Sequence, residues 1–135
     1  MTPIEQPVKN FKSKKKLLSV KVIKREDITN DLLKIWIEKP DEYTFKPGQY
    51  CTIGINGIER AYSIVSAPYE GDLELFVELV PESEGGVLTP LIWDLSSGDT
   101  VTIRPRAKGI FVFNGQWKNH VLVATVTGVV PYISF

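Results

Sequence analysis

Cysteine, histidine and methionine are almost absent from this 135-residue chain, which contains one of each. With Cys51 as the sole thiol, no disulfide can form within the chain, and a metal cluster held by cysteines is not expected. We therefore expect a reducing compartment such as the cytoplasm. An excess of one charge is also missing, because sixteen basic and sixteen acidic residues leave a formal net charge of zero. That balance argues against a general binder of nucleic acid or of membrane surfaces.

Long apolar runs are absent as well. No stretch approaches the roughly 20 apolar residues of a membrane-spanning helix, and no apolar segment follows the N-terminal lysines as it would in a signal peptide. The lysines of this region cluster in residues 1–16, at Lys9, Lys12, Lys14, Lys15 and Lys16. We interpret residues 1–16 as a basic tail, which is either simply solvated or a docking patch for an acidic partner protein.

Alternating apolar residues indicate short strands through most of the remaining chain. In the first of them, Leu18, Val20 and Val22 fall on one face and the residues between them on the other. Asn56-Gly57, set between two isoleucines, is a strong hairpin signal. The segments predicted as strands are residues 17–25, 33–37, 49–55, 60–66, 73–80 and 101–105.

One segment between the fifth and sixth predicted strands has helical spacing instead. Thr89 is suited to the N-cap, Pro90 to the first helical position and Gly98 to the point where the helix stops. Six short antiparallel strands with one short helix predict a mainly β fold. We expect the strands to form a closed or nearly closed barrel, because closure removes exposed sheet edges.

The end of the chain differs in kind from the rest. Residues 120–124 form an apolar run of the sort found in parallel strands buried on both faces, and Pro131 suits the start of a helix. A doubly wound α/β domain begins with this order of elements. We therefore expect residues 17–114 to form the barrel domain and residues 115–135 to be the truncated start of a second, α/β domain.

Three segments carry residue types that suit a ligand with both a ring and phosphates. Arg60 and Tyr62 share one face of a strand, where a guanidinium fork can hold a phosphate and a phenol ring can stack. Residues 84–90 place two glycines before the predicted helix, where backbone amides can approach a phosphate. Residues 125–128 place threonine and glycine after the apolar run, as in dinucleotide sites. Taken singly, each segment is more simply interpreted as a solvated strand face or an ordinary loop.

In this order, the segments resemble the ferredoxin–NADP reductase superfamily, and most closely the bacterial ferredoxin/flavodoxin–NADP reductases. The resemblance extends from Leu17 onward and implies a six-stranded antiparallel Greek-key barrel that binds FAD, followed by an α/β domain that binds NADP(H). The motifs that carry it are Phe45-Lys46-Pro47-Gly48-Gln49-Tyr50, Arg60-Ala61-Tyr62-Ser63-Ile64, Gly86-Val87-Leu88-Thr89-Pro90, Gly98-Asp99 and Val123-Ala124-Thr125.

The resemblance also implies roles for individual residues. Arg60 is expected at the FAD pyrophosphate, Tyr62 against the isoalloxazine ring and Ser63 near the flavin N5, which makes Tyr62 and Ser63 the candidate catalytic residues. Backbone amides of Val87, Leu88 and Thr89, with the Thr89 hydroxyl, are expected at the phosphates. The remaining candidates for cofactor binding are Ala61, Phe76, Gly86 and Thr127, the last approaching from the second-domain side.

One turn departs from the family pattern. Where the family has Thr-Gly-Thr-Gly or a similar run, this chain has Thr125-Val126-Thr127-Gly128, and Val130 adds bulk near an expected small residue. If the turn needs a positive φ at position 126, a valine is strained there.

The implied activity is that of an FAD-dependent NAD(P)H oxidoreductase, in which a hydride passes from NADPH to the flavin and single electrons pass to a ferredoxin or flavodoxin, an acidic redox protein. The cofactor supplies that chemistry, and the protein binds and tunes it. Two alternatives stay open: a flavin-binding module completed by another chain, and the reductase component of an oxygenase. A barrel that binds no flavin is a third.

Overall fold

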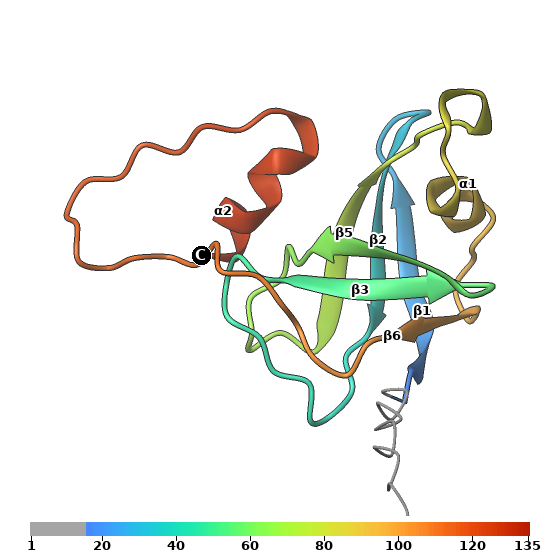
Figure 1. Ribbon diagram of the computed structural model, residues 1–135, viewed down its shortest axis with the longest axis horizontal. Coiled ribbons are helices and arrows are strands. Elements are labelled where there is room, and N and C mark those ends of the chain that lie inside the picture. The colour runs from blue at the N-terminus through green and yellow to red at the C-terminus, as the bar shows by residue number, and fades with distance from the viewer. Residues whose placement is uncertain (1–15) are drawn as a thin grey trace, which may run out of the picture.

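The computed structural model describes residues 16–135, and its strands wrap around a single core (Figure 1). Of the predicted basic tail, residues 1–15 lie outside the described residues, and Lys16 is exposed. The strands are β1 (Leu18–Asp27), β2 (Leu32–Glu38), β3 (Tyr50–Ile55), β4 (Ile58–Ser63), β5 (Asp72–Glu78) and β6 (Thr100–Ile103). The helical elements are the 3-10 turns η1 (Glu82–Glu84) and η2 (Val126–Val129) and the α-helices α1 (Leu88–Trp93) and α2 (Val130–Ser134).

The six strands form one antiparallel sheet in the order β4-β3-β6-β1-β2-β5. Because β6 inserts between β1 and β3, the arrangement is of Greek-key type. The two edges of the sheet approach each other where Ile64 bridges to Leu75 and the Val65 amide donates to the Glu74 carbonyl at 2.8 Å. The predicted mainly β, nearly closed barrel is therefore confirmed.

The predicted alternation sets which side chains enter the barrel. Val20 and Val22 are 2% and 1% exposed, whereas Ile23 on the opposite face is 47% exposed. Strands β2 and β5 contribute their alternate residues to the same core, and burying each such aliphatic side chain contributes about 1.5–3 kcal/mol. The hairpin prediction is confirmed too, since Asn56 and Gly57 connect β3 and β4 with φ of 52° and 79°.

Helix α1 differs from its predicted form at both ends. It begins at Leu88, its N-cap position is Val87, and no side chain caps it, so the prediction of Thr89 as the N-cap is wrong. The Thr89 hydroxyl instead bonds to the backbone of Val80, which the fold brings beside it. The helix ends at Trp93, and Gly98, with φ of 92°, lies in the later turn that leads into β6.

The predicted strand at residues 120–124 is not formed. Residues 111–126 are exposed, and in Figure 1 this part of the chain makes a long excursion from the barrel before it returns at α2. A strand needs hydrogen-bonding partners on a neighbouring strand, and within residues 16–135 none pairs with this segment. Pro131 does lie in the first turn of α2, as predicted.

The returning segment is anchored to the barrel by a buried hydrogen bond. The Ser134 hydroxyl donates to the Ser66 carbonyl at 2.9 Å, and both residues are buried. Aromatic contacts support it, with ring centroids 5.6 Å apart for Phe111 and Tyr132. These contacts hold η2 beside β5. In residues 16–135, no helix combines the length and apolar character needed to cross a bilayer.

Candidate functional site

Two adjoining hollows on the outside of the barrel contain every residue predicted to bind the cofactor. We call the one of about 360 Å³ the strand hollow; it is lined by Ala61, Tyr62, Ser63, Phe76, Glu78, Val80, Thr89, Thr127 and Val130. We call the one of about 300 Å³ the loop hollow; it is lined by Arg60, Ala61, Tyr62, Val80, Gly85, Gly86, Val87, Leu88 and Thr89. The hollows share four residues, so they form one continuous depression. Segments far apart in the sequence thus meet at one site.

Strand β4 presents the polar and aromatic residues of this depression. Arg60 pairs with Ile53 of β3 and Tyr62 with Cys51, so both lie on the face that carries these buried side chains. Tyr62 packs partly against the core, whereas Arg60 is exposed. The Arg60 Nη1 donates to the Glu59 carbonyl oxygen at 2.7 Å, which leaves the rest of its guanidinium fork toward the loop hollow.

Ser63 and Ala61 lie on the other face of β4. Their partners across the β3–β4 pair are Tyr50 and Thr52. Ser63 is the last residue of β4, immediately before the point where Ile64 bridges to Leu75 of β5. It therefore reaches the strand hollow together with Tyr62, although the alternation of a regular strand separates them.

Two glycines shape the loop before α1. Gly85 has φ of 87°, a conformation that favours glycine. A Cβ atom on Gly86 would lie 1.7 Å from the Val80 carbonyl oxygen, so only glycine lets the chain fold back this closely. The backbone of Val80 fills the space that a side chain would need, and the tight loop that results lines the loop hollow.

The phenol of Tyr62 is neutral at physiological pH, as in an ordinary tyrosine, and burial extends that neutral form to higher pH. Desolvation raises its pKa to about 12, and the nearby positive charge of Arg60 only partly opposes this. The ring therefore offers a flat, uncharged surface to both hollows at physiological pH.

The C-terminal segment also contributes to the wall of the strand hollow. Thr127 and Val130 line it, and Val126 next to them has φ of 46°. Position 126 therefore does adopt the left-handed conformation in which a β-branched residue is strained, as the departure from the family pattern predicted.

Sequence reasoning missed several residues of the depression. Glu78, Val80, Gly85 and Val130 line it but were not among the predicted cofactor-binding residues. Glu78 follows Phe76 by two residues on the same face of β5, and this spacing is the signal that identifies it. Val80 has no comparable signal, because it enters the site only through its contacts with Gly86 and Thr89.

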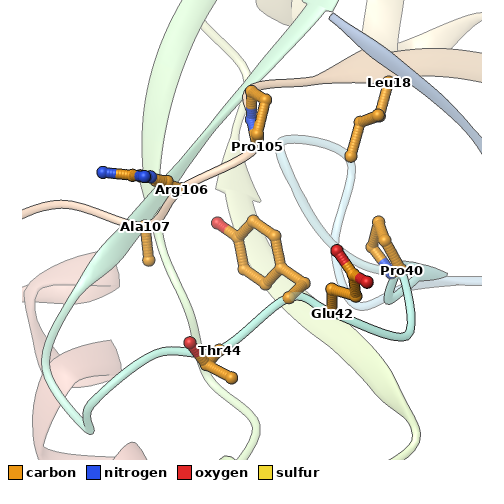
Figure 2. Close-up of a pocket in the computed structure, with 8 residues that line it drawn as sticks. Leu18, Pro40, Glu42, Thr44, Pro105, Arg106 and Ala107 are labelled. Carbon is orange, nitrogen blue, oxygen red and sulfur yellow. The ribbon is translucent and has the colours of Figure 1, made fainter.

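Two further hollows lie on another part of the barrel. Figure 2 shows the larger, of about 490 Å³, where Arg106 and Glu42 lie on opposite sides and Leu18, Pro40 and Pro105 supply apolar walls. None of the predicted site residues lines it. The other, of about 350 Å³, we call the basic groove; it is lined by Lys16, Leu18, Arg104, Pro105, Arg106 and Lys108.

The antiparallel barrel carries a guanidinium, a neutral aromatic ring and a glycine-shaped loop along one outer depression. These features define the class of barrels that bind a cofactor with both a ring system and phosphates. Comparison with known proteins agrees. The family model of the oxidoreductase FAD-binding domain matches residues 19–112, well over half of the chain. The protein therefore belongs to this family of FAD-binding oxidoreductase domains.

Several of its curated relatives are named as reductases. The chain is 33% identical over 124 residues to a flavodoxin/ferredoxin–NADP reductase of Buchnera aphidicola, covering 87% of this chain and 48% of the relative. It is 33% identical over 120 residues to the enzyme of that name from Escherichia coli, covering 84% and 47%. The chain thus spans about half the length of the curated relatives it matches.

Solved structures show the same barrel. A ferredoxin NADP+ reductase from Neisseria gonorrhoeae, crystallised with bound FAD and NADP, superposes with a TM-score of 0.80 at 29% identity, over 87% of this chain and 49% of that one. A cytochrome P450 reductase from Amycolatopsis superposes with a TM-score of 0.71 at 28% identity, over 87% and 38%.

The residues of the depression fit FAD. The exposed Arg60 guanidinium lines the loop hollow together with the loop of Gly85 and Gly86, which suits a pyrophosphate, and the neutral Tyr62 ring suits an aromatic ring system. No acidic side chain lines the loop hollow. Glu78 is the one carboxylate in the depression, and it lies in the strand hollow, away from Arg60.

Proposed function

We propose that this chain is the flavin-binding part of an FAD-dependent NAD(P)H oxidoreductase of the ferredoxin/flavodoxin–NADP reductase type. The observation that carries the proposal is the convergence of β4, β5, the loop before α1 and η2 on one depression. In this proposal residues 17–114 are the FAD-binding barrel domain, residues 115–135 are the start of an NAD(P)-binding domain, and residues 1–16 are a basic tail.

Each group of residues has a part in holding the cofactor. The Arg60 fork binds the pyrophosphate, and backbone amides of Val87 and Leu88, which line the same hollow, supplement it. The Tyr62 ring stacks on the ring system and keeps water from it, and the Ser63 hydroxyl donates a hydrogen bond beside it. Phe76 and Thr127 border the same space. FAD, when bound, supplies the chemistry of hydride and single-electron transfer.

We also propose a cytoplasmic enzyme that takes electrons from NADPH and passes them to a ferredoxin or flavodoxin. The relatives' names and the basic groove support an acidic redox partner. The Lys108 amide donates to the Tyr50 carbonyl at 3.0 Å, and Tyr50 pairs with Ser63. Two strand spacings, about 10 Å, therefore separate the backbone of the groove from the strand hollow. A partner held at the groove is within range for electron transfer.

The test of cofactor binding is an absorption spectrum of the purified chain with added FAD, followed by anaerobic NADPH. We expect a resolved, protein-bound flavin spectrum that is lost in the Arg60→Ala/Tyr62→Ala variant, because the phosphate fork and the stacking ring are both removed. A folded chain that binds no FAD would refute the proposal.

The reductase component of an oxygenase is the second candidate. The likeness to the Amycolatopsis cytochrome P450 reductase favours it. Addition of NADPH to the FAD-loaded chain distinguishes a chain that accepts a hydride from a flavin-binding module that does not. Flavin bleaching shows that the chain accepts a hydride, whereas bound flavin that does not bleach shows a module that needs another chain. Titration of the bleached protein with oxidised flavodoxin, ferredoxin or an oxygenase then identifies the acceptor.

A further inference from the structure

The hollow of Figure 2 contains a buried hydroxyl group without a hydrogen-bond partner. We call it the tyrosine hollow; it is lined by Leu18, Pro40, Glu42, Tyr43, Thr44, Pro105, Arg106 and Ala107. Tyr43 is 4% exposed, and within residues 16–135 no group forms a hydrogen bond with its hydroxyl. Nearly all buried polar groups are hydrogen-bonded, because an unpaired one costs free energy. The Tyr43 hydroxyl is therefore available to a ligand.

A bulge in the chain after β6 forms one wall of the tyrosine hollow. Ile103 pairs with Ile53 of β3, and the same antiparallel register would place Arg106 opposite Tyr50. Tyr50 bridges to Lys108 instead, so the chain after β6 has two extra residues here and bows away from β3. The bulge carries the Arg106 guanidinium to the hollow.

The Tyr43 hydroxyl lies near this bulge. Cys51 is the β3 residue next to Tyr50, opposite the bulge, and its thiol is close enough to add to the effect of burial, which raises the pKa of the Tyr43 phenol. The phenol thus stays protonated and can donate a hydrogen bond. Donors from Tyr43 and Arg106 are therefore found at the same end of the hollow.

Glu42 lies on the side of the hollow opposite Arg106 (Figure 2). Both side chains are exposed, and neither forms a salt bridge with another of residues 16–135. Leu18, Pro40 and Pro105 provide apolar walls. A volume of about 490 Å³ suits a small molecule. The hydroxyl is shielded from water in the free chain, but the exposed side chains around it can rearrange as a ligand enters.

We propose that the tyrosine hollow binds a small zwitterion that has a carboxylate and an ammonium group at opposite ends of an apolar body. Arg106 and the Tyr43 hydroxyl donate to the carboxylate, and Glu42 accepts from the ammonium group. The leucine and the prolines of the wall cover the apolar body. The tyrosine hollow shares no residue with the strand hollow or the loop hollow, so this inference does not depend on FAD.

The test compares three probes that differ only in their charged groups. The zwitterion para-aminomethylbenzoate carries both groups, para-methylbenzoate lacks the ammonium group, and benzylamine lacks the carboxylate. We expect the zwitterion to bind the 135-residue chain with a Kd of about 5 mM or below, and the other two at least roughly twofold more weakly. In an NMR titration, the amide shifts that change should be those of residues 40–44 and 105–107.

Charge variants test the two ends of the hollow. Arg106→Met and Glu42→Gln should each weaken binding of the zwitterion roughly two- to fivefold, because each removes one charged partner at a solvent-exposed position. Asp41→Asn is the matched control. Asp41 is exposed next to Glu42 but does not line the hollow, so its loss should change the Kd less than about 1.5-fold.

Tyr43→Phe separates ligand binding from a structural role of the hydroxyl. Because the hydroxyl has no partner in the free chain, its removal should leave the urea midpoint of unfolding unchanged or raise it. The same variant should bind the zwitterion roughly three- to tenfold more weakly, because a hydrogen bond to its charged carboxylate is lost. Tyr69→Phe is the matched control, since Tyr69 is 90% exposed and its variant should change neither quantity.

Weaker binding of the zwitterion by all three hollow variants, with both controls unchanged, supports the inference. No binding of the zwitterion, equal affinity for the three probes, or shift changes confined to other residues overturns it. A Tyr43→Phe variant with a lower urea midpoint and unchanged affinity also overturns it, because the hydroxyl then serves the fold. A chain that binds the zwitterion but no FAD refutes the proposed function alone, and a chain that binds FAD but no zwitterion refutes this inference alone.

Discussion

Thr89 and Val80 are joined by two hydrogen bonds through one side-chain oxygen. Thr89 Oγ1 accepts from the Val80 amide at 2.9 Å and donates to the Val80 carbonyl at 3.0 Å. Both residues line the strand hollow and the loop hollow, so this pair lies at the boundary between the two hollows. It fixes the start of α1 against the chain that leaves β5, and with it the loop shaped by Gly86.

Replacing Thr89 with valine tests this pair at nearly constant side-chain shape. Thr89→Val should lower the free energy of unfolding by about 1 kcal/mol, because two backbone groups lose their partner and turn to water. Urea unfolding measures the change. Thr44→Val is the matched control, since Thr44 is exposed and its stability should change by less than about 0.5 kcal/mol. Equal effects of the two substitutions would argue against the structural role of the pair.

Gly86→Ala should disrupt the loop hollow. Its new methyl group would lie 1.7 Å from the Val80 carbonyl oxygen, so the backbone has to move. We expect a loss of about 1–3 kcal/mol in the free energy of unfolding and an FAD affinity at least roughly tenfold weaker, since the amides of the loop shift away from the phosphates. Gly71→Ala is the control, because nothing lies within 4 Å of its added carbon. If Gly86→Ala binds FAD as well as the control does, the loop does not hold the phosphates.

Val126→Gly should relieve strain in the turn before α2. The φ of 46° disfavours a β-branched residue and suits glycine, so we expect local opening of the turn to become harder by about 1 kcal/mol. Hydrogen exchange of the Gly128 amide, which donates to the Thr125 carbonyl at 2.8 Å, reports on this opening. Val129→Gly is the control of opposite sign, because Val129 has φ of −68° and glycine loosens an ordinary helical position. Faster exchange in both variants would contradict the strain.

Cys51 should be unreactive in the folded chain. It is fully buried, and burial raises the pKa of its thiol to about 12, so the thiol stays neutral at pH 8, where an ordinary cysteine is partly ionised. A thiol-specific chromogenic reagent should therefore react only as fast as the barrel opens, and at once in denaturing urea. Ser83→Cys in a Cys51→Ala background places a thiol at an exposed position and should react at the ordinary rate. Comparable rates for the two thiols in folded protein would show that the barrel wall is open at Cys51.

Local features of the sequence determined much of the fold of this protein. Alternation of apolar residues located all six strands, and Asn56-Gly57 located the β3–β4 hairpin, because both depend on near neighbours and on backbone sterics. The same local information, with the family resemblance, placed Arg60, Tyr62 and the glycine loop among the site residues. These residues do meet in one depression.

Only the tertiary structure decided which groups distant in sequence become partners. Thr89 is a reasonable N-cap by its residue type. The chain that leaves β5, however, brings Val80 within reach, and the Thr89 hydroxyl forms hydrogen bonds with the Val80 backbone instead. Residues 120–124 have the composition of a buried strand, but strand formation requires a neighbour that no described segment provides. Glu59 and Arg104, 45 residues apart, meet only because β6 inserts between β1 and β3. Hydrogen bonds and ion pairs of this kind depend on the path of the whole chain, which local periodicity does not contain.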